Sequence, residues 1–305
     1  MPALTTYTKP ITTAQAEKLR AILLEKGWLF EEKQYTLFAA SGPKVSLAVY
    51  EKGPKVVLQG KGIEDFIKFT LEPEVLGAAE LGYEEVHQPD MFTPHIGVDE
   101  SGKGDFLGPL VIAGAYVDGD MARTLRDMGA VDSKRIGSDA GIIALATAMR
   151  KAQVIHETVV ISPERYNQLY SEFGNLNKLL AWGHAKVIEN LLARVPGCPR
   201  ALSDQFANPR VLQNALQAKG KTIILEQRTK AESDPAVAAA SIFARERFVL
   251  WLEQTGAKMG VHLPKGVSSA VKAAGKKIFQ QHGIEGLAKV GKMHFRTAQE
   301  VSVPS

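Results

Sequence analysis

The residues best suited to chemistry are two adjacent acids, Asp99 and Glu100, which follow the apolar run Ile96-Gly97-Val98. The run has the composition of a buried strand, so the two carboxylates stand where that strand ends. Carboxylates in such a place suit a hard divalent cation, which takes oxygen ligands and can bridge protein acids to a phosphate. An exposed acidic turn is the alternative interpretation of these two residues.

The turn after these acids, Ser101-Gly102-Lys103-Gly104, differs from the common nucleotide-binding turns. A dinucleotide-binding turn places glycines directly after the strand and a helix behind them, and here the two carboxylates occupy that place. Their negative charge would repel a bare pyrophosphate, and neither the G-x-G-x-x-G spacing nor the P-loop pattern is present. The strand end therefore suits a cation better than the phosphates of a dinucleotide.

Two further acids lie in contexts that could bring them to the same place. Asp204 follows the short apolar run Ala201-Leu202, so it can stand at the end of a neighbouring strand beside Asp99. Glu232 lies just ahead of the alanine-rich stretch 236–241, whose small residues can bring the start of a helix close to a sheet. Each acid alone is better explained as a cap or a surface residue, and it is the ordered set that indicates a site.

The elements that must position these acids form two patterns along the chain. From His95 onward, strand-like runs alternate with segments of helical length, which is typical of a sheet with helices packed on it. The expected strands are 96–98, 110–117, 158–161, 200–202 and 222–225, and the expected helices are 142–151, 177–194, 209–219 and 236–252. Asp234 and Pro235 supply a cap and a first-position proline for the last helix.

Residues 1–75 have the pattern of a smaller, separate α+β domain. Thr12 and Gln15 form a capping box, which predicts a helix that stops near Gly27. The strands expected next are 35–39, 45–50 and 55–59, followed by a helix over 63–71. Turn sequences separate the three strands, so they should form an antiparallel meander. We expect residues 76–94 to be a linker and residues 95–305 to form the second domain.

Composition places the chain among folded globular proteins, because 45% of its 305 residues are hydrophobic and 23% are charged. The single cysteine, Cys198, excludes an internal disulfide and a cysteine-based zinc site, which favours a reducing compartment and oxygen or histidine ligands for any metal. No apolar run is long enough to span a membrane, and Met1 to Pro10 lack the features of a signal peptide. We therefore expect a cytoplasmic protein with no membrane partner.

The net charge of +4 conceals two basic regions. Between Ala257 and Arg296 the only acid is Glu285, and the basic residues are Lys258, Lys265, Lys272, Lys276, Lys277, Lys289, Lys292 and Arg296. Such a stretch suits a phosphate backbone, and a solvated helical face is the alternative. The second basic region lies between residues 33 and 61, where the only acid is Glu51 and the lysines are Lys33, Lys44, Lys52, Lys55 and Lys61. A sheet that is basic on one side could hold a nucleic-acid backbone, and a plain folding or partner-binding appendage is the alternative.

Together these motifs resemble the type 2 ribonucleases H, and within them ribonuclease HIII. The likeness covers roughly residues 96–296 and rests on residues 97–104 with 108–110, Asp132-Ser133-Lys134, residues 201–206, and Lys230-Ala231-Glu232 before residues 238–242. Gly-Lys-Gly in the turn and a glutamate as the fourth acid are features of ribonuclease HIII, whereas ribonuclease HII normally has Gly-Arg-Gly and aspartate. Residues 1–75 resemble the TATA-box-binding-protein-like module of ribonuclease HIII in size and element order.

The resemblance implies an α/β fold, a ribonuclease H-like mixed sheet flanked by helices after a small α+β TATA-box-binding-protein-like domain. It implies that Asp99, Glu100, Asp204 and Glu232 are the catalytic residues and hold Mg²⁺ or Mn²⁺ against the scissile phosphate of RNA in an RNA/DNA hybrid. In such a site one metal would lower the pKa of a bound water, and a second, about 4 Å away, would stabilise the leaving oxygen. The products would carry 3′-hydroxyl and 5′-phosphate ends.

The resemblance also implies how RNA is distinguished from DNA, which requires a contact with the 2′-hydroxyl. The glycines of the turn would let the main chain approach the sugar, and Lys103 would meet a phosphate. The implied substrate-binding residues are Ser101, Gly102, Lys103, Gly104, Ser133 and Lys134. We expect a monomer that cleaves hybrids, and the alternatives are incision at single ribonucleotides in duplex DNA, as in ribonuclease HII, and binding of hybrids without cleavage.

Overall fold

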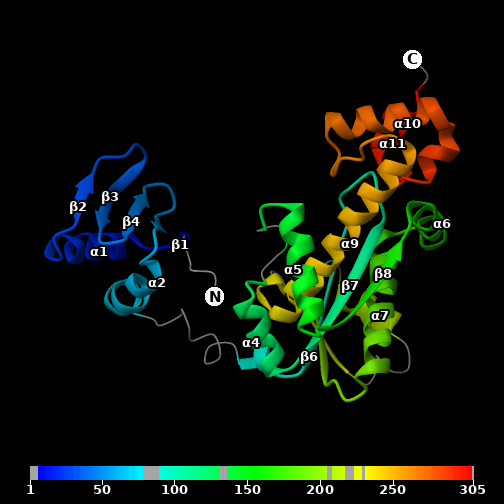
Figure 1. Cartoon of the computed structure of the whole chain (residues 1–305). Coiled ribbons are helices and arrows are strands. Elements are labelled where there is room, and N and C mark those ends of the chain that lie inside the picture. The colour runs from blue at the N-terminus through cyan, green and yellow to red at the C-terminus, as the bar shows by residue number, and fades with distance from the viewer. Residues whose placement is uncertain are drawn as a thin grey trace. The chain divides into compact units, whose positions relative to one another are not determined.

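The computed structural model describes residues 6–77, 89–130, 133, 136–204, 208–216, 223–228 and 231–303. The chain forms two compact units, residues 1–90 and 91–305 (Figure 1). Most of the expected linker, residues 78–88, lies outside the described residues. No helix in the described ranges is both long and apolar enough to cross a membrane.

The N-terminal unit is built on one antiparallel sheet with the strand order β1-β5-β4-β3-β2. Its strands are β1 (Thr6–Pro10), β2 (Leu29–Glu31), β3 (Thr36–Gly42), β4 (Val45–Tyr50) and β5 (Lys55–Gln59). The predicted meander is confirmed, since β4 pairs with both β3 and β5. The two strands at the edges of the sheet, β1 and β2, were not expected from the sequence.

Helix α1 (Thr13–Glu25) begins where the capping box predicts, with Thr12 N donating to Gln15 Oε1 at 2.8 Å and Gln15 N donating to Thr12 Oγ1 at 3.2 Å. The predicted second helix starts at Ile63 as α2 (Ile63–Phe66) and continues as wider π-helical turns, η1 (Ile67–Leu76). Apolar residues of α1, α2 and η1 share one core with alternate residues of β3, β4 and β5. The helices therefore pack on a single face of the sheet.

The second unit contains a mixed sheet with the order β10-β9-β6-β7-β8. Its strands are β6 (His95–Ser101), β7 (Leu110–Val117), β8 (Ile155–Ile161), β9 (Arg200–Asp204) and β10 (Ile224–Arg228). Strands β6, β7 and β8 are antiparallel neighbours, whereas β9 runs parallel to both β6 and β10. The predicted mixed sheet is confirmed.

Helical segments pack on this sheet, and the longest, α9, runs along its strands in Figure 1. The segments are η2 (Pro89–Phe92), α4 (Gly119–Asp127), α5 (Asp139–Lys151), α6 (Pro163–Phe173), α7 (Leu176–Arg194), α8 (Pro209–Ala215), η5 (Ala231–Ser233), α9 (Pro235–Met259), α10 (Ser269–Ala288) and α11 (Arg296–Val301). The sequence did not predict α4, α6, α10 or α11. Helix α10 contains a non-helical residue, Gly283, which kinks it.

The two faces of the sheet meet different helices, as the alternation of side chains along a strand requires. In β7, Val111 and Ala113 share a core with α4, α5 and α9, while Leu110 and Ile112 share a core with α6 and α7. Gly97 in β6 faces the first turn of α9, where any Cβ would collide with the backbone at Ala236 and Val237. This glycine lets the start of α9 approach the strand that carries Asp99 and Glu100.

Candidate metal centre and nucleic-acid interface

Asp99 and Asp204 stand side by side where the pairing of two parallel strands stops. The register of β6 and β9 pairs Val98 with Ser203, so Asp99 and Asp204 follow at the next position. Adjacent strands lie about 4.8 Å apart. The tertiary structure therefore brings together two acids that are far apart in the chain. Asp204 ends β9 as expected, but β6 continues through Asp99 and Glu100 to Ser101, so the expectation of a strand that ends at Asp99 was wrong.

Alternation along the strands places these two acids on the face of the sheet that α9 covers. Leu202, two residues before Asp204, packs with Ala231 of η5 and Val237 of α9. The Ala231 backbone N donates to Asp204 Oδ1 at 3.5 Å. The next residue after Ala231 is Glu232, so its backbone lies beside Asp204, although its side chain is not among the described ones.

The start of α9 is fixed by a buried pair that the sequence did not reveal. The carboxylate of Asp234 accepts hydrogen bonds from the backbone N of Ala236 at 2.9 Å and of Val237 at 3.3 Å. Its oxygens also lie 2.9 and 3.0 Å from His95 Nε2, and His95 Nδ1 lies 2.7 Å from Thr93 O. Since His95 is the first residue of β6, this pair joins the strand of Asp99 to the helix that follows Glu232.

Glu100 lies on the opposite face of the sheet and contacts α7. His184 Nε2 lies 3.1 Å from Glu100 Oε2, and His184 Nδ1 lies 3.0 Å from Ser203 Oγ. The Ser203 hydroxyl donates to Asp204 O at 3.0 Å, so its oxygen is free to accept from His184. Lys103 Nζ lies 3.3 Å from the other carboxylate oxygen of Glu100. Glu100 is thus joined through His184 and Ser203 to the strand that ends in Asp204.

These partners decide the ionisation of Glu100. Burial alone would raise the pKa of its carboxyl, but the hydrogen bond and charge of His184, together with those of Lys103, outweigh burial and lower the pKa to about 2. Glu100 is therefore an anion at neutral pH despite its burial. An ionised carboxylate is the form that a hard divalent cation binds.

His184 was missed because the histidines form no metal-ligand motif in the sequence. A signal was nevertheless present, since His184 falls between Leu180 and Val187 on the apolar face of a predicted helix. A polar side chain at a buried position needs a hydrogen-bond partner. The helical pattern could predict that His184 is buried. It could not predict the partner, Glu100, because that residue is 84 positions away in the chain.

The donor set fits a divalent cation in its chemistry. Asp99, Glu100 and Asp204 offer only oxygen ligands, which Mg²⁺ and Mn²⁺ prefer. Within the described part of the chain, no three His, Cys, Asp or Glu side chains form a group that could hold a metal. For the fourth predicted ligand, Glu232, the structure describes only the backbone, which lies beside Asp204.

The glycines of the turn at residues 101–104 have different structural roles. Gly102 has φ +89°, and a Cβ there would collide with Pro109 O and crowd Phe248, so the fold itself requires this glycine. Gly104 has no positive φ, and a Cβ there would have no neighbour within 4 Å. Ser101 ends β6 opposite Val111. The packing of the described residues therefore explains why residue 102 is a glycine, but it does not explain the glycine at residue 104.

Ser133 is mostly buried and is bound to α9. Its backbone N donates to Ser241 Oγ at 3.3 Å, and the two hydroxyl oxygens lie 2.6 Å apart. Ser133 also lines a polar cavity of about 250 Å³ together with Ser138, Arg245 and Lys265. Lys134, which was predicted to contact substrate beside it, lies outside the described residues.

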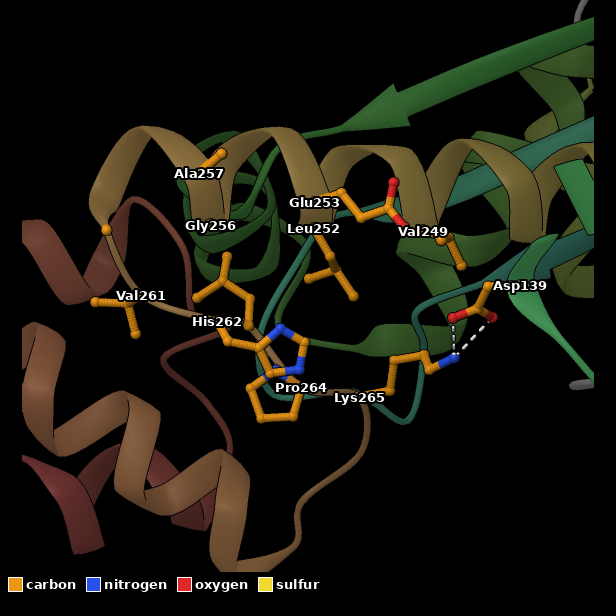
Figure 2. A pocket seen from close by; sticks show the side chains of 12 residues that line it. Asp139, Val249, Leu252, Glu253, Gly256, Ala257, Val261, His262, Pro264 and Lys265 are labelled. Carbon is orange, nitrogen blue, oxygen red and sulfur yellow. Dashed lines mark hydrogen bonds and ion pairs between the residues drawn. The ribbon is translucent and has the colours of Figure 1, made fainter.

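A larger cavity of about 530 Å³ lies along the C-terminal half of α9 (Figure 2). Leu252 and Val261 contribute to its apolar lining, and His262 is a polar residue of the lining. Lys265 closes one side and is paired with Asp139, with Nζ 2.7 Å from both carboxylate oxygens. The lining residues include none of the predicted acids, so this cavity is separate from the candidate metal centre.

The expected basic C-terminal stretch is only partly available to a phosphate backbone. Lys265 is paired with Asp139, Lys272 Nζ lies 2.8 Å from Glu300 Oε2, and Lys292 is fully buried. The other lysines of the stretch, Lys258, Lys276, Lys277 and Lys289, are exposed, and so are Lys265 and Arg296. The prediction of a continuous basic footprint was too broad, because sequence does not show which charges meet acids from other elements.

The five lysines that were expected to make the N-terminal sheet basic lie at the two ends of that sheet. Lys44 and Lys61 are adjacent at one end, where Gly62 N donates to Lys44 O. The others, Lys33, Lys52 and Lys55, lie in or beside the turns at the opposite end. The prediction of a sheet that is basic on one side was wrong, because turn residues project from the sheet ends rather than from a face.

Comparison with known proteins gives concordant results for both units. The profile of the family described as Ribonuclease HII matches residues 96–298. Proteins named Ribonuclease HIII from Chlamydia abortus and Protochlamydia amoebophila are 43% and 42% identical, and the alignments cover 96% and 99% of this chain and 97% and 98% of theirs. The crystal structure of Bst-RNase HIII in complex with Mn²⁺ matches with a TM-score of 0.67 at 28% identity, covering 97% of this chain and 98% of that one. The Aquifex aeolicus RNase H3 structure matches with a TM-score of 0.55 at 28% identity, covering 95% and 100%.

Proposed function

Because this chain belongs to the ribonuclease HIII group of the ribonuclease HII family, we propose that it hydrolyses the RNA strand of RNA/DNA hybrids as a metal-dependent endoribonuclease. The products carry 3′-hydroxyl and 5′-phosphate ends. The observation that carries the proposal is the register of β6 and β9, which pairs Val98 with Ser203 and so sets Asp99 beside Asp204 where this pairing stops. Full-length similarity to proteins named Ribonuclease HIII supports the same reaction.

Asp99, Glu100, Asp204 and Glu232 are proposed to hold Mg²⁺ or Mn²⁺. When bound, two such cations supply an activated water and stabilise the charge on the leaving oxygen. The protein's contribution is to align and ionise the ligands. His184 keeps Glu100 an oriented anion, and the His95–Asp234 pair fixes the helix start next to Glu232.

The turn Gly102-Lys103-Gly104 is proposed to recognise the ribose, with Ser101 leading into it. Gly104 supports this role, because the described packing leaves open space where its Cβ would be. Lys103 is partly exposed, so its ammonium can reach a phosphate while it remains near Glu100. Ser133 and Lys134 are proposed as phosphate contacts, and the polar cavity that Ser133 shares with Arg245 suits an anion.

The N-terminal domain, residues 1–75, is proposed to bind the hybrid, with residues 76–94 as a linker to the catalytic domain, residues 95–305. The support for this proposal comes from charge, since the sheet carries lysines at both of its ends. The lysines at the sheet ends can then neutralise phosphates on either side.

We propose that the protein works as a monomer in the cytoplasm. The only cysteine, Cys198, is a buried free thiol, which suits a reducing compartment. Light scattering of the purified protein tests the first statement, and a stable dimer would contradict it.

Cleavage assays on four labelled duplexes test the function. They are an RNA/DNA hybrid, a DNA duplex with one ribonucleotide, double-stranded RNA and double-stranded DNA, each with Mg²⁺, with Mn²⁺ or with EDTA. The proposal expects cleavage of the hybrid in either metal and none in EDTA. A strong preference for the single ribonucleotide would instead indicate incision as in ribonuclease HII, and binding without cleavage would indicate a hybrid-binding protein.

A further inference from the structure

Lys292 is a lysine with none of its surface exposed to solvent. Its Nζ donates to two backbone carbonyls, Asp105 O at 2.8 Å and Gly108 O at 2.6 Å. Burial lowers the pKa of Lys292 to about 7, although the nearby Asp105 carboxylate opposes this change. A neutral amine has two N–H donors, which match the two carbonyls. Lys292 therefore serves the backbone of residues 105–108 and has no access to a phosphate.

The segment that Lys292 holds is the direct continuation of the turn at residues 102–104. Asp105 N donates to Gly102 O at 3.3 Å, so the segment and the turn form one unit. On one side this unit packs on α9, because a Cβ at either Gly102 or Gly108 would lie within 3 Å of the Phe248 ring. The position of the turn thus depends on what holds residues 105–108 in place.

On the other side, the C-terminal residues of the chain hold the segment through their backbone. Lys292 N donates to Phe106 O at 2.9 Å, and Gly108 N donates to Val290 O at 2.8 Å. Gly266 N also donates to the Asp105 carboxylate at 2.6 Å. Among the described side chains, that of Lys292 binds the carbonyls at both ends of residues 105–108. Removal of its two hydrogen bonds would leave both carbonyls without these donors in a buried place, and the segment would have to shift to recover partners.

We propose that Lys292 is a positioning residue for RNA recognition, which fixes the main chain of Gly102-Lys103-Gly104 where it meets the ribose by holding the carbonyls of Asp105 and Gly108. This inference rests on the proposed function, because it concerns how that turn distinguishes RNA from DNA. Lys292 lies about 190 residues from the turn and acts through it rather than on the substrate. A positioning role of this kind affects the discrimination between ribose and deoxyribose as well as the rate of cleavage.

The test compares three variants of the full chain with the wild type. Lys292→Met keeps a flexible side chain of similar length and removes both donors. Lys292→Gln restores a neutral N–H donor group on a shorter side chain. Lys151→Met is the control, since it removes one exposed lysine at the end of α5, remote from the turn in the described contacts. Circular dichroism gives the folded fraction of each variant.

The substrates are a hybrid with one preferred cleavage site and a series in which each nucleotide near that site is changed in turn to 2′-deoxy. The discrimination factor is the rate on the all-ribose hybrid divided by the rate on the most affected deoxy hybrid. Because a displacement of about 1 Å can cost a hundredfold in rate, we expect Lys292→Met to lose about tenfold or more on the all-ribose hybrid. Its discrimination factor should fall as well, with Lys292→Gln intermediate and the control unchanged.

A purely structural role predicts a different result. A smaller folded fraction lowers both rates equally and leaves the discrimination factor unchanged, so an unchanged factor in the Lys292 variants would overturn the inference. Failure of both variants to fold would overturn it too, because Lys292 would then serve stability alone. If the wild type does not cleave the hybrid, the proposed function itself fails, whereas an unchanged factor in active variants refutes the role of Lys292 only.

Discussion

His184 Nε2 lies 3.1 Å from Glu100 Oε2, although the two residues are on different elements and 84 positions apart in the chain. The contact keeps the carboxylate ionised and oriented on the α7 face of the sheet. Replacing a residue that orients a metal ligand typically costs 10–100-fold in metal affinity or activity. We expect a decrease of about that size in Mn²⁺ affinity for His184→Ala, measured by calorimetry. The exposed His282 gives the matched control, His282→Ala, and equal affinities in the two variants would refute this role.

Asp99 and Asp204 should be needed for cleavage and dispensable for binding. Asp99→Asn and Asp204→Asn each remove the charge that a cation requires while they preserve shape, so hybrid cleavage should be abolished and hybrid affinity retained. Gel-based cleavage and fluorescence anisotropy measure the two quantities, and the exposed Asp127→Asn is the control. Normal turnover in either variant would show that the cation is held elsewhere.

Gly102 and Gly104 should respond differently to alanine. Gly102→Ala places a Cβ at φ +89° against Pro109 O and Phe248, so we expect its free energy of unfolding to fall by about 1 kcal/mol or more. Gly104→Ala meets nothing within 4 Å in the protein and should keep its stability. If the main chain approaches the ribose here, Gly104→Ala should raise KM for the hybrid. Equal effects of both changes on stability and KM would contradict this distinction.

Lys292 should make stability depend on pH. Its folded pKa, about 7, is below the ordinary value of 10.5, so the unfolded chain binds more protons between these values and the free energy of unfolding rises with pH. Across the whole window the gain in the free energy of unfolding is about 5 kcal/mol. Urea unfolding of the wild type and of Lys292→Met at pH 7.0 and 8.5 measures the part of this increase that falls between those two pH values. A steeper rise in the variant than in the wild type would count against this assignment.

Lys44 and Lys61 should contribute to hybrid affinity without affecting chemistry. Both lie at one end of the N-terminal sheet, and the slope of log K against log salt becomes shallower by about 0.9 for each phosphate that is no longer neutralised. The double change Lys44→Ala with Lys61→Ala should therefore weaken binding and flatten that slope at unchanged kcat. Lys18→Ala, on the exposed side of α1, is the control. An unaltered salt slope would mean that this end of the sheet does not face the hybrid.

The sequence determined those features that depend on local pattern. Strand β7 and the start of α1 follow from apolar runs and capping residues, and Asp204 was expected beside Asp99 because both follow short apolar runs. The motif residues also placed the chain in its family. These inferences need only the alternation of side chains in strands and the rules for helix ends.

Only the tertiary structure decided which polar groups meet. The His184–Glu100 and His95–Asp234 contacts, the Ser133–Ser241 hydrogen bond and the burial of Lys292 join segments that no local rule relates. The same Lys292 that suggested a phosphate contact in the sequence is hidden under the turn it supports. Composition and periodicity specify what each segment can bury, whereas the choice of partner depends on how helices and strands far apart in the chain pack together.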